Sequence, residues 1–402
     1  MISYEESMKQ LASVEVQSAA IERVFLSDAL GRILAEDIIA EENSPVYPTS
    51  AMDGYAIMAE DQQVGYIQVL GDDNPAGAEE IAEVTPGFCI KTFTGSLMPK
   101  GADTLIPIEN VTFEGDKITI KEDVPQGFSV RPVGENFQKD DILLRKGTKL
   151  GYAEIGVMAS LNIVMAPVFI QPRVAVLSTG SEILDLGQSA THASQIRSSN
   201  NYTLAALAEQ SGAKSVQLGI VKDDEASITR AFENALASAD IIVTTGGVSV
   251  GDYDFVKDII PRLGAEVIYK GVRIKPGQHI MLAKKENKFI IGLPGFAYSS
   301  TVTFMLYVIP IIRRMLSLGA DLPRIEAVLM QDFNKRAKKT EFTPCNLVYE
   351  NGQYEVDFEG KKVGSSAILT NMLGPCALVV TGEESGSLAK GSKVEVINLL
   401  AL

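Results

Sequence analysis

The 402-residue sequence contains little cysteine and almost no histidine. Its three cysteines, Cys89, Cys345 and Cys376, lie far apart without a Cys-x-x-Cys pair. This argues against a zinc site or a disulfide framework and favours a protein of the reducing cytoplasm. The only histidines are His192 and His279, so a metal site or catalytic triad built on histidine is not expected.

The sequence also lacks an excess of positive charge and a long apolar run. A net charge of −15 argues against broad binding to nucleic acid or to an anionic membrane, because both need clustered Lys and Arg. The apolar segment Thr301 to Ile312 is broken by Pro310 and followed by Arg313-Arg314, which predicts a core helix and not a membrane span. The N-terminus has no basic region or apolar core of a signal peptide. Length and composition predict two to four globular domains.

Secondary-structure signals divide the chain into a helical start, a β-rich stretch, an alternating region and a β-rich end. Helices are predicted over Tyr4–Ala12, with Ser3 as cap, and over Ala29–Ile39. A turn-rich β segment runs from about Thr49 to Asp140, and a helix over Ala153–Leu161 follows it. The final segment, from Arg324, carries an Asn351-Gly352 hairpin signal and predicts a small β barrel.

From Arg173 onward, strands alternate with helices. Such alternation predicts a parallel sheet with helices on both faces, so the fold class is α/β with appended β-rich domains. The strands are predicted at Val174–Leu177, Val216–Val221, Asp240–Thr244 and Phe289–Gly292. The helices are predicted at Asn200–Gln210 (capped by Ser199 or Asn200), Glu225–Ser238, Phe255–Ile260 and a long stretch ending near Leu316.

A glycine-rich turn follows the third of these strands. The segment Thr244-Thr245-Gly246-Gly247-Val248-Ser249-Val250-Gly251-Asp252-Tyr253-Asp254 combines hydroxyls, carboxylates and exposed backbone. Ligands bind open α/β sheets at the carboxyl ends of the strands, and glycines let backbone N–H groups approach a phosphate. An ordinary tight turn without a ligand is the alternative.

Polar loops should follow all four strands at one edge of the sheet, because the strands are parallel. This edge would collect Glu182, Asp223, Asp224, Asp252 and Asp254, an oxygen-only set that suits Mg²⁺. Each acid alone is equally well explained as a helix cap or a first-turn residue.

A run of cations, Lys270 to His279, lies in an otherwise acidic protein. Its lysines suit the neutralisation of a phosphate or an oxyanion, although a basic hairpin paired with surface acids is the simpler interpretation. The separate cluster Lys335-Arg336-Lys338-Lys339 is interpreted as a solvated face.

Seven motifs, in order, resemble those of the molybdopterin molybdenumtransferases of MoeA type, which include the gephyrin E domain. The resemblance spans nearly the whole chain. The motifs are Ser50-Ala51-Met52-Asp53-Gly54-Tyr55-Ala56, Thr94 to Thr104, Val130 to Asn136, Ser178-Thr179-Gly180-Ser181-Glu182, Gly246 to Gly251, Lys275-Pro276-Gly277 and Gly292-Leu293-Pro294-Gly295.

This resemblance implies four domains and a homodimer. A discontinuous helical dimerisation domain (1–47 and 141–168) would be interrupted by a β-rich inserted domain (48–140). A MoaB/MogA-like doubly wound sheet domain (169–321) would bind molybdopterin, and a C-terminal β-barrel domain (322–402) would follow. The implied reaction is Mg²⁺-dependent: molybdate and adenylylated molybdopterin give molybdenum cofactor and AMP. Other proteins of molybdenum cofactor biosynthesis are possible partners.

The resemblance also assigns residue roles. Glu182, Asp223 and Asp254 would surround Mg²⁺ and the nucleotide phosphates, Lys275 would neutralise molybdate or phosphate, and Asp53 would reach a partner's cleft. Without the resemblance, Asp53 would be interpreted as a turn acid. The implied substrate-binding residues are Arg131, Ser178, Thr179, Gly180, Gly246, Gly247, Ser249, Gly251, Pro276, Gly277, Pro294, Gly295, Ser299 and Ser365.

The sequence departs from the family pattern at three places, each near the implied oxyanion site. Phe296-Ala297-Tyr298 replaces Asn-Pro-Val, Gln278 replaces a second lysine, and Pro344 stands where arginine is usual. Losing a charge-assisted hydrogen bond weakens binding by roughly tenfold or more. These departures keep open a degenerate pterin-binding or scaffold paralogue. A molybdopterin adenylyltransferase is a further alternative, because the isolated pterin-binding domain is similar in both groups.

Overall fold

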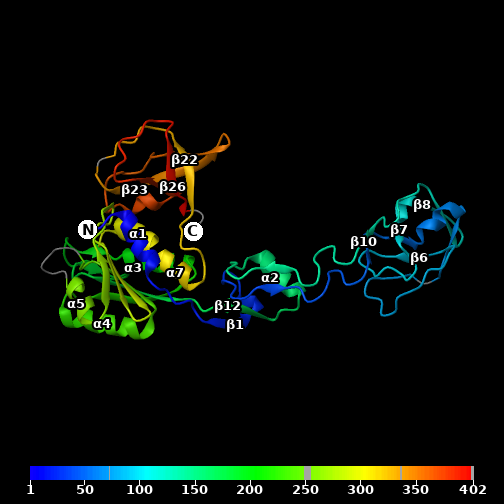
Figure 1. Ribbon diagram of the computed structural model, residues 1–402, viewed down its shortest axis with the longest axis horizontal. Helices are drawn as coiled ribbons and strands as arrows, with labels where there is room; N and C mark the ends of the chain where they lie inside the picture. The colour runs from blue at the N-terminus through cyan, green and yellow to red at the C-terminus, as the bar shows by residue number, and fades with distance from the viewer. Residues whose placement is uncertain (72, 249–254, 336, 400–402) are drawn as a thin grey trace. The chain divides into compact units, whose positions relative to one another are not determined.

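The computed structural model describes residues 1–71, 73–248, 255–335 and 337–399. The chain folds into two compact units, each of which is described by itself (Figure 1). The first unit consists of Met1–Ala35, Lys149–Gly151 and Met165–Leu402, and the second of Glu36–Thr148 and Tyr152–Val164. No helix of the described residues is long and apolar enough to cross a bilayer.

A six-stranded sheet forms the centre of the first unit, in the order β16-β13-β17-β21-β20-β18. The first four of these strands are parallel, and β20 and β18 add an antiparallel edge. The strands are β13 (Arg173–Thr179), β16 (Lys214–Val221), β17 (Ile241–Thr245), β18 (Glu266–Lys270), β20 (Met281–Lys285) and β21 (Lys288–Leu293). The α/β fold class predicted from alternating elements is confirmed.

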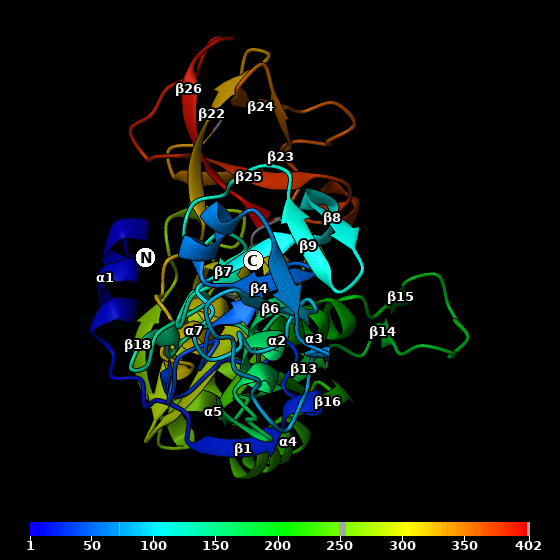
Figure 2. The same cartoon turned by 90° about the vertical axis from the view of Figure 1, so that its right-hand side faces the viewer.

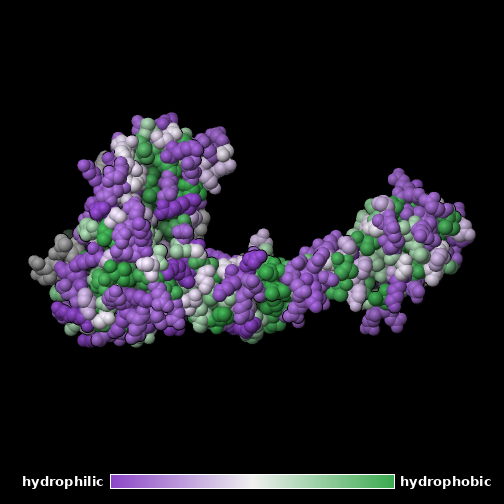
Figure 3. Space-filling model, viewed as in Figure 1, coloured by the Kyte–Doolittle hydropathy of each residue, from purple (hydrophilic) through white to green (hydrophobic). Residues whose placement is uncertain are grey.

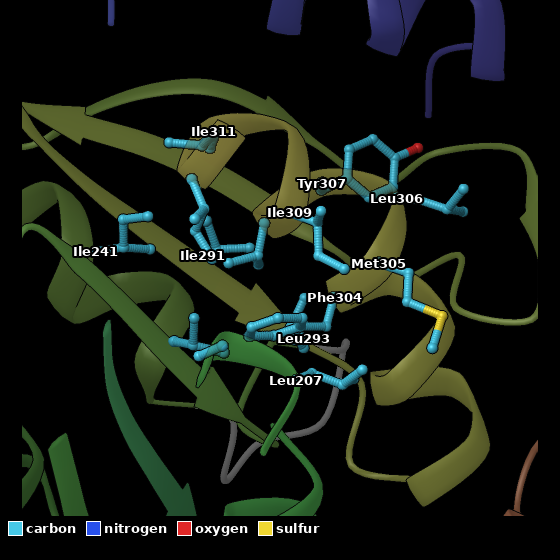
Figure 4. Packing of buried hydrophobic residues seen from close by; sticks show 14 of the residues in the cluster. Leu207, Ile241, Ile291, Leu293, Phe304, Met305, Leu306, Tyr307, Ile309 and Ile311 are labelled. Carbon is cyan, nitrogen blue, oxygen red and sulfur yellow. The ribbon is translucent and has the colours of Figure 1, made fainter. Parts of the chain in front are cut away.

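Apolar side chains cover both faces of this sheet. On one face α4 (Glu225–Ser238) and α5 (Val256–Arg262) contribute Phe232 and Ile260; the outer surface of these helices is largely polar (Figure 3). The other face receives α3 (Asn200–Gln210) and a long helical segment made of α6 (Ala297–Thr303), a π-turn and α7 (Ile309–Met315). In Figure 4, Ile291 and Leu293 of β21 face Phe304 and Ile309 of this segment. The predicted long helix ending near Leu316 is thus confirmed.

The N-terminal segment packs against the same core. Helix α1 spans Tyr4–Ser13, and the Ser3 hydroxyl accepts the N–H of Glu6 at 3.1 Å, as predicted. The predicted helix over Ala29–Ile39 is wrong: Leu26–Asp28 forms a 3₁₀ turn and β2 (Ile38–Ile39) is a strand. Bridges from Ile33 to Lys149 and from Leu34 to Val168 draw this stretch into extended pairing, so tertiary contacts override its helical periodicity.

The C-terminal part of the first unit is a closed five-stranded barrel, with strands β22, β23 and β26 labelled in Figure 2. Strand β23 pairs with both β24 and β25, and the ring closes through β22 and β26. Asn351 (φ 51°) and Gly352 (φ 80°) form the predicted hairpin between β23 and β24, as expected for a turn that needs two positive φ angles. The barrel strands are β22 (Arg324–Leu329), β23 (Thr340–Glu350), β24 (Gln353–Asp357), β25 (Cys376–Thr381) and β26 (Lys393–Ile397).

Three short pairings complete the first unit. Strand β1 (Ile21–Phe25) pairs with β12 (Met165–Phe169), and β14 (Ile183–Leu184) pairs with β15 (Ile196–Arg197). Strand β19 (Ile274–Lys275) joins β23 of the barrel in parallel. This last pairing fixes the loop after β18 against the barrel.

The second unit is β-rich, as predicted. Its main sheet has the order β7-β4-β6-β5-β9-β8. The strands are β4 (Gly54–Ile57), β5 (Ile67–Val69), β6 (Phe88–Thr92), β7 (Thr104–Pro107), β8 (Val111–Glu114) and β9 (Lys117–Ile120). Two ribbons pair β3 (Thr49–Ser50) with β10 (Val130–Arg131) and β2 with β11 (Ile142–Leu144), and the unit includes α2 (Tyr152–Ser160).

Candidate functional site

The carboxyl ends of four parallel strands meet at one edge of the central sheet, as the sequence predicts. Thr179 of β13 is in register with Val221 of β16, and Thr245 of β17 is in register with Leu293 of β21. The Gly246 N–H donates to the Leu293 carbonyl oxygen at 3.1 Å. The loops that follow these strands therefore begin side by side.

Close backbone approaches confirm this convergence. A Cβ atom placed on Gly246 would lie 3.2 Å from both the carbonyl and the hydroxyl oxygen of Thr179. One placed on Gly295 would lie 3.9 Å from the Gly246 Cα atom. The predicted binding residues Thr179, Gly180, Gly246, Gly247, Pro294 and Gly295 thus lie along one continuous edge. Ser249, Gly251 and Asp254 lie outside the described residues.

A buried polar network holds these strand ends together. The Ser178 hydroxyl lies 2.7 Å from the side-chain oxygen of Asn201 and 2.8 Å from the Thr245 hydroxyl. The Asn200 amide donates to the Gly295 carbonyl oxygen at 2.8 Å, and the Asn201 amide donates to the Gly219 carbonyl oxygen at 3.1 Å. Ser178 is therefore buried and holds β13 to α3 and β17, and its predicted contact with a substrate stays a prediction.

Neither asparagine is among the site residues predicted from the sequence. Asn200 and Ser199 were predicted only as possible caps of α3, but neither side chain caps the helix. The available signal was two adjacent amides at the start of a helix that leads away from the predicted edge. Adjacent amides are unusual there unless both find partners, because a buried amide without hydrogen bonds is costly.

The predicted acids differ in role. Asp224 is the N-cap of α4, and its carboxylate accepts the Ser227 N–H at 2.8 Å. This hydrogen bond holds the pKa of Asp224 below its usual range. Glu182 is exposed just after β13, with both carboxylate oxygens 2.9 Å from a Cβ placed on Gly180. Asp223 follows β16, the neighbouring strand.

Metal binding at this edge stays a prediction. No cluster of three or more metal-ligating side chains is present among the residues that the structure describes. Glu182 and Asp223 follow adjacent strands and carry only oxygen donors, which is the chemistry that Mg²⁺ prefers. These carboxylates fit an ion that keeps several waters and takes its other ligands from substrate phosphates.

A second group of predicted residues surrounds a pocket between the α/β domain and the barrel, within the first unit. The pocket is lined by Lys275, Pro276, Tyr298, Glu341, Phe342, Thr343, Pro344, Val363, Gly364, Ser365 and Ser366. The Ser299 N–H donates to the Ser366 carbonyl oxygen at 3.1 Å. A Cβ placed on Gly277 would lie 3.7 Å from Pro294. Lys275, Pro276, Gly277, Pro294, Ser299 and Ser365 are therefore neighbours.

Lys275 has a partner that the sequence analysis missed. Its ammonium lies 3.3 Å from a carboxylate oxygen of Glu341, which is only 4% exposed. The pairing follows from the register of β19 and β23, which aligns Lys275 with Glu341. No local sequence signal links positions that are 66 residues apart. The pocket's own cation is thus compensated by a buried anion.

The prediction that the cluster Lys335-Arg336-Lys338-Lys339 forms a solvated face is wrong for two of its lysines. Lys338 is exposed, but Lys335 and Lys339 are half-buried. Lys335 donates to the carbonyl oxygens of Gly382 and Glu383, and Lys339 donates to the side-chain oxygen of Gln278. Arg336 lies outside the described residues. Lys335 is therefore tied to the loop after β25 of the barrel, Lys339 contacts the α/β domain, and Lys338 alone of the described three is solvated.

The cysteines do not supply a nucleophile. All three are buried. Burial raises the pKa of the Cys89 thiol to about 12 and raises the pKa values of Cys345 and Cys376 above their usual range. Thiols in such surroundings stay protonated and inert. Chemistry at this site therefore depends on oxygen and nitrogen groups.

In the second unit, three predicted motifs come together. Asp53 accepts hydrogen bonds from the N–H and hydroxyl of Thr94 at 2.8 and 2.7 Å, which hold the pKa of its carboxyl below the usual range. Arg131 pairs with Thr49 across β10 and β3 and forms an ion pair with Glu135 at 2.5 Å. Asp53 is thus a turn acid in this unit, and its proposed catalytic role stays a prediction.

Three family models match successive parts of the chain. Residues 2–162 match the MoeA N-terminal region (domain I and II), residues 175–314 a probable molybdopterin binding domain, and residues 326–399 the MoeA C-terminal region (domain IV). The molybdopterin molybdenumtransferase of Haemophilus influenzae is 32% identical over 93% of both chains. That of Bacillus subtilis is 30% identical over 98% of this chain and 94% of its own.

A solved structure gives the same result. The molybdopterin biosynthesis MoeA protein of Pyrococcus horikoshii OT3 is 30% identical, with a TM-score of 0.81 over 98% of this chain and 99% of its own. The fold is that of an α/β transferase with β-rich appended domains. The chain belongs to the MoeA family of molybdopterin molybdenumtransferases, which confirms the resemblance seen in its motifs.

Proposed function

We propose that this protein inserts molybdate into adenylylated molybdopterin, with Mg²⁺ as cofactor and release of AMP. The observation that carries the proposal is the convergence of two groups of motif residues in one unit. The strand-end loops around Gly246 and Gly295 lie beside the pocket of Lys275 and Ser365 through the Gly277–Pro294 contact. A phosphorylated ligand and a small oxyanion would then bind side by side.

Each part of this site has a distinct task. Backbone N–H groups of the glycine turns would hold the phosphates, since a bare backbone can approach an anion closely. Glu182 and Asp223, with Asp254 from the sequence, would hold Mg²⁺, which when bound neutralises charge on the pyrophosphate. Lys275, Ser299 and Ser365 would position molybdate. Catalysis would thus depend on positioning and electrostatic stabilisation.

The proposal includes a cytoplasmic homodimer with the four domains predicted from the sequence. In a dimer, Asp53 and Arg131 would approach the cleft of the partner subunit. Exposed apolar residues on and near β1, namely Ile21, Phe25 and Leu30, offer surface for such an interface. Other proteins of cofactor biosynthesis would deliver the pterin and accept the product.

The test is a turnover assay on the full chain. Purified protein is mixed with adenylylated molybdopterin, molybdate and Mg²⁺, and AMP is quantified by chromatography. We expect AMP release that requires both the oxyanion and the cation. A protein that binds the pterin but releases no AMP at any molybdate concentration would contradict the proposal. AMP transfer from ATP to molybdopterin would instead identify an adenylyltransferase.

One observation favours a second function, that of a pterin-binding protein with little activity. Among the described residues that line the pocket, Lys275 is the one cation, and Glu341 compensates it. Pro344 and Gln278 carry no charge to replace this cation. Tight binding of adenylylated molybdopterin, measured by calorimetry, without turnover would support this alternative.

A further inference from the structure

Four cations of the described residues lie around the seam that holds the Lys275 pocket, and two of them have carboxylate partners. The Arg273 guanidinium donates to the Glu383 carboxylate at 2.8 and 3.2 Å. Lys275 is paired with Glu341. Lys335 donates to two backbone carbonyl oxygens, which tie it to the loop after β25. Ion pairing thus neutralises Arg273 and Lys275, whereas Lys335 keeps its charge but is hydrogen-bonded to fixed backbone oxygens.

Lys339 differs from Lys335 in that its partner is a side chain and not the fixed backbone. Its ammonium donates to the neutral side-chain oxygen of Gln278, and no carboxylate of the described residues pairs with it. The Gln278 amide nitrogen in turn lies 2.9 Å from Nε2 of His279. A half-buried ammonium has lost part of its hydration, and one amide dipole replaces it poorly. An anion would satisfy it better.

The backbone places Lys339 beside the pocket. Thr340, the next residue, is in register with Ile274, and its N–H donates to the Arg273 carbonyl oxygen at 3.2 Å. Glu341 accepts the Ala337 N–H at 2.9 Å while it also pairs with Lys275. One buried carboxylate therefore holds both the pocket lysine and the segment that carries Lys339.

We propose that Lys339 binds the oxyanion substrate at the mouth of this pocket, exchanging its hydrogen bond to Gln278 for one to an anion oxygen. The pair Lys275–Glu341 is neutral and Lys335 is held by backbone oxygens, so among the described residues Lys339 supplies the positive charge that a tetrahedral dianion needs. The hydroxyls of Ser365 and Ser366 on the pocket wall add neutral donors. The identity of the oxyanion as molybdate rests on the proposed function.

The experiment measures molybdate binding to the full chain by equilibrium dialysis, with molybdenum determined elementally and no pterin present. We expect Lys339→Met to weaken binding by roughly tenfold or more, because a charge-assisted hydrogen bond is lost. Lys339→Arg should retain most of the affinity. Lys338→Met changes the same charge at the exposed neighbour and should alter binding by less than about twofold. Thermal unfolding of each variant verifies folding.

The outcomes separate this inference from the proposed function. Equal weakening in both methionine variants would assign the effect to net charge and overturn the inference, as would a wild-type protein that binds no molybdate. If the protein binds molybdate through Lys339 but releases no AMP, the result supports the role of Lys339 and contradicts the proposed turnover. In an active enzyme, Lys339→Met should raise the KM for molybdate and leave kcat unchanged.

Discussion

Two neighbouring carboxylates at the end of β16 show how position decides role. Asp224 accepts a hydrogen bond from the Ser227 N–H as the N-cap of α4, so its carboxylate stabilises the start of the helix. Asp223 precedes the cap, at the edge where the strand-end loops converge. A sequence pattern alone cannot separate the two, because either acid can cap a helix that begins at Glu225.

The first prediction concerns Asp223. We expect Asp223→Asn to reduce AMP release by about a hundredfold or more, since it removes a charge that would stabilise the metal and phosphates. Circular dichroism should show an unchanged fold. Asp224→Ala serves as the matched control and should retain activity. Equal loss of activity in both variants would show that the effect arises from damage to α4.

The second prediction concerns the pH dependence of the Asp224 cap. The hydrogen bond from the Ser227 N–H lowers the folded-state pKa of Asp224 below its ordinary 3.8. The Asp224 carboxylate therefore stabilises the folded protein fully above the pKa that this group has in the unfolded chain. This stabilisation is lost as the pH falls through its pKa in the folded protein. Asp224→Ala should lower the thermal midpoint by a few degrees at neutral pH and by less in strong acid. A difference that grows on acidification would contradict this assignment.

At the scale of elements, the segment Ala297–Met315 joins the site to the core. Its first turn carries Ser299 beside the pocket, whereas Phe304 and Tyr307 are fully buried against the sheet. The Tyr307 hydroxyl also lies 3.0 Å from the Ser7 hydroxyl of α1. One apolar segment therefore anchors the oxyanion pocket and the N-terminal helix.

The third prediction tests this anchoring. Phe304 is fully buried, and Phe304→Ala should lower the free energy of unfolding by about 3–5 kcal/mol, because it leaves a cavity. Phe296 directly precedes the same segment and is 64% exposed. Phe296→Ala should therefore change the free energy of unfolding by less than about 0.5 kcal/mol. Urea denaturation measures both. Similar losses would place Phe296 in the packed core.

At the scale of the whole molecule, the chain forms two units, each with its own apolar core. A Cβ on Gly54 would lie 2.2 Å from the Ile106 carbonyl oxygen, within the sheet of the second unit. A Cβ on Gly277 would lie 2.3 Å from Thr303, within the first unit, at a φ of +93°. A side chain added at either glycine therefore creates a clash within one unit only.

The fourth prediction follows from this separation. Calorimetry of the full chain should show two unfolding transitions, since each unit has its own apolar core. Gly54→Ala should lower only one midpoint and Gly277→Ala only the other, by several degrees each, because each creates a backbone or side-chain clash. A single transition that moves with either substitution would show that the units unfold together.

Local sequence signals predicted most of the fold. The boundaries of α3 and α4 and the convergence of four strand ends follow from periodicity and from the geometry of parallel sheets. The contacts that define the site do not. Glu341 opposite Lys275, Gln278 opposite Lys339 and the paired asparagines of α3 all depend on residues distant in sequence.

The closed barrel has a consequence for synthesis of the chain. Strand β22 pairs with β26, so Arg324 meets Ile397 only after the whole barrel segment has left the ribosome. Until then β22 and β25 each present an open hydrogen-bonding edge. A premature stop codon before Lys393 would make both edges permanent, and such edges recruit other chains into aggregates.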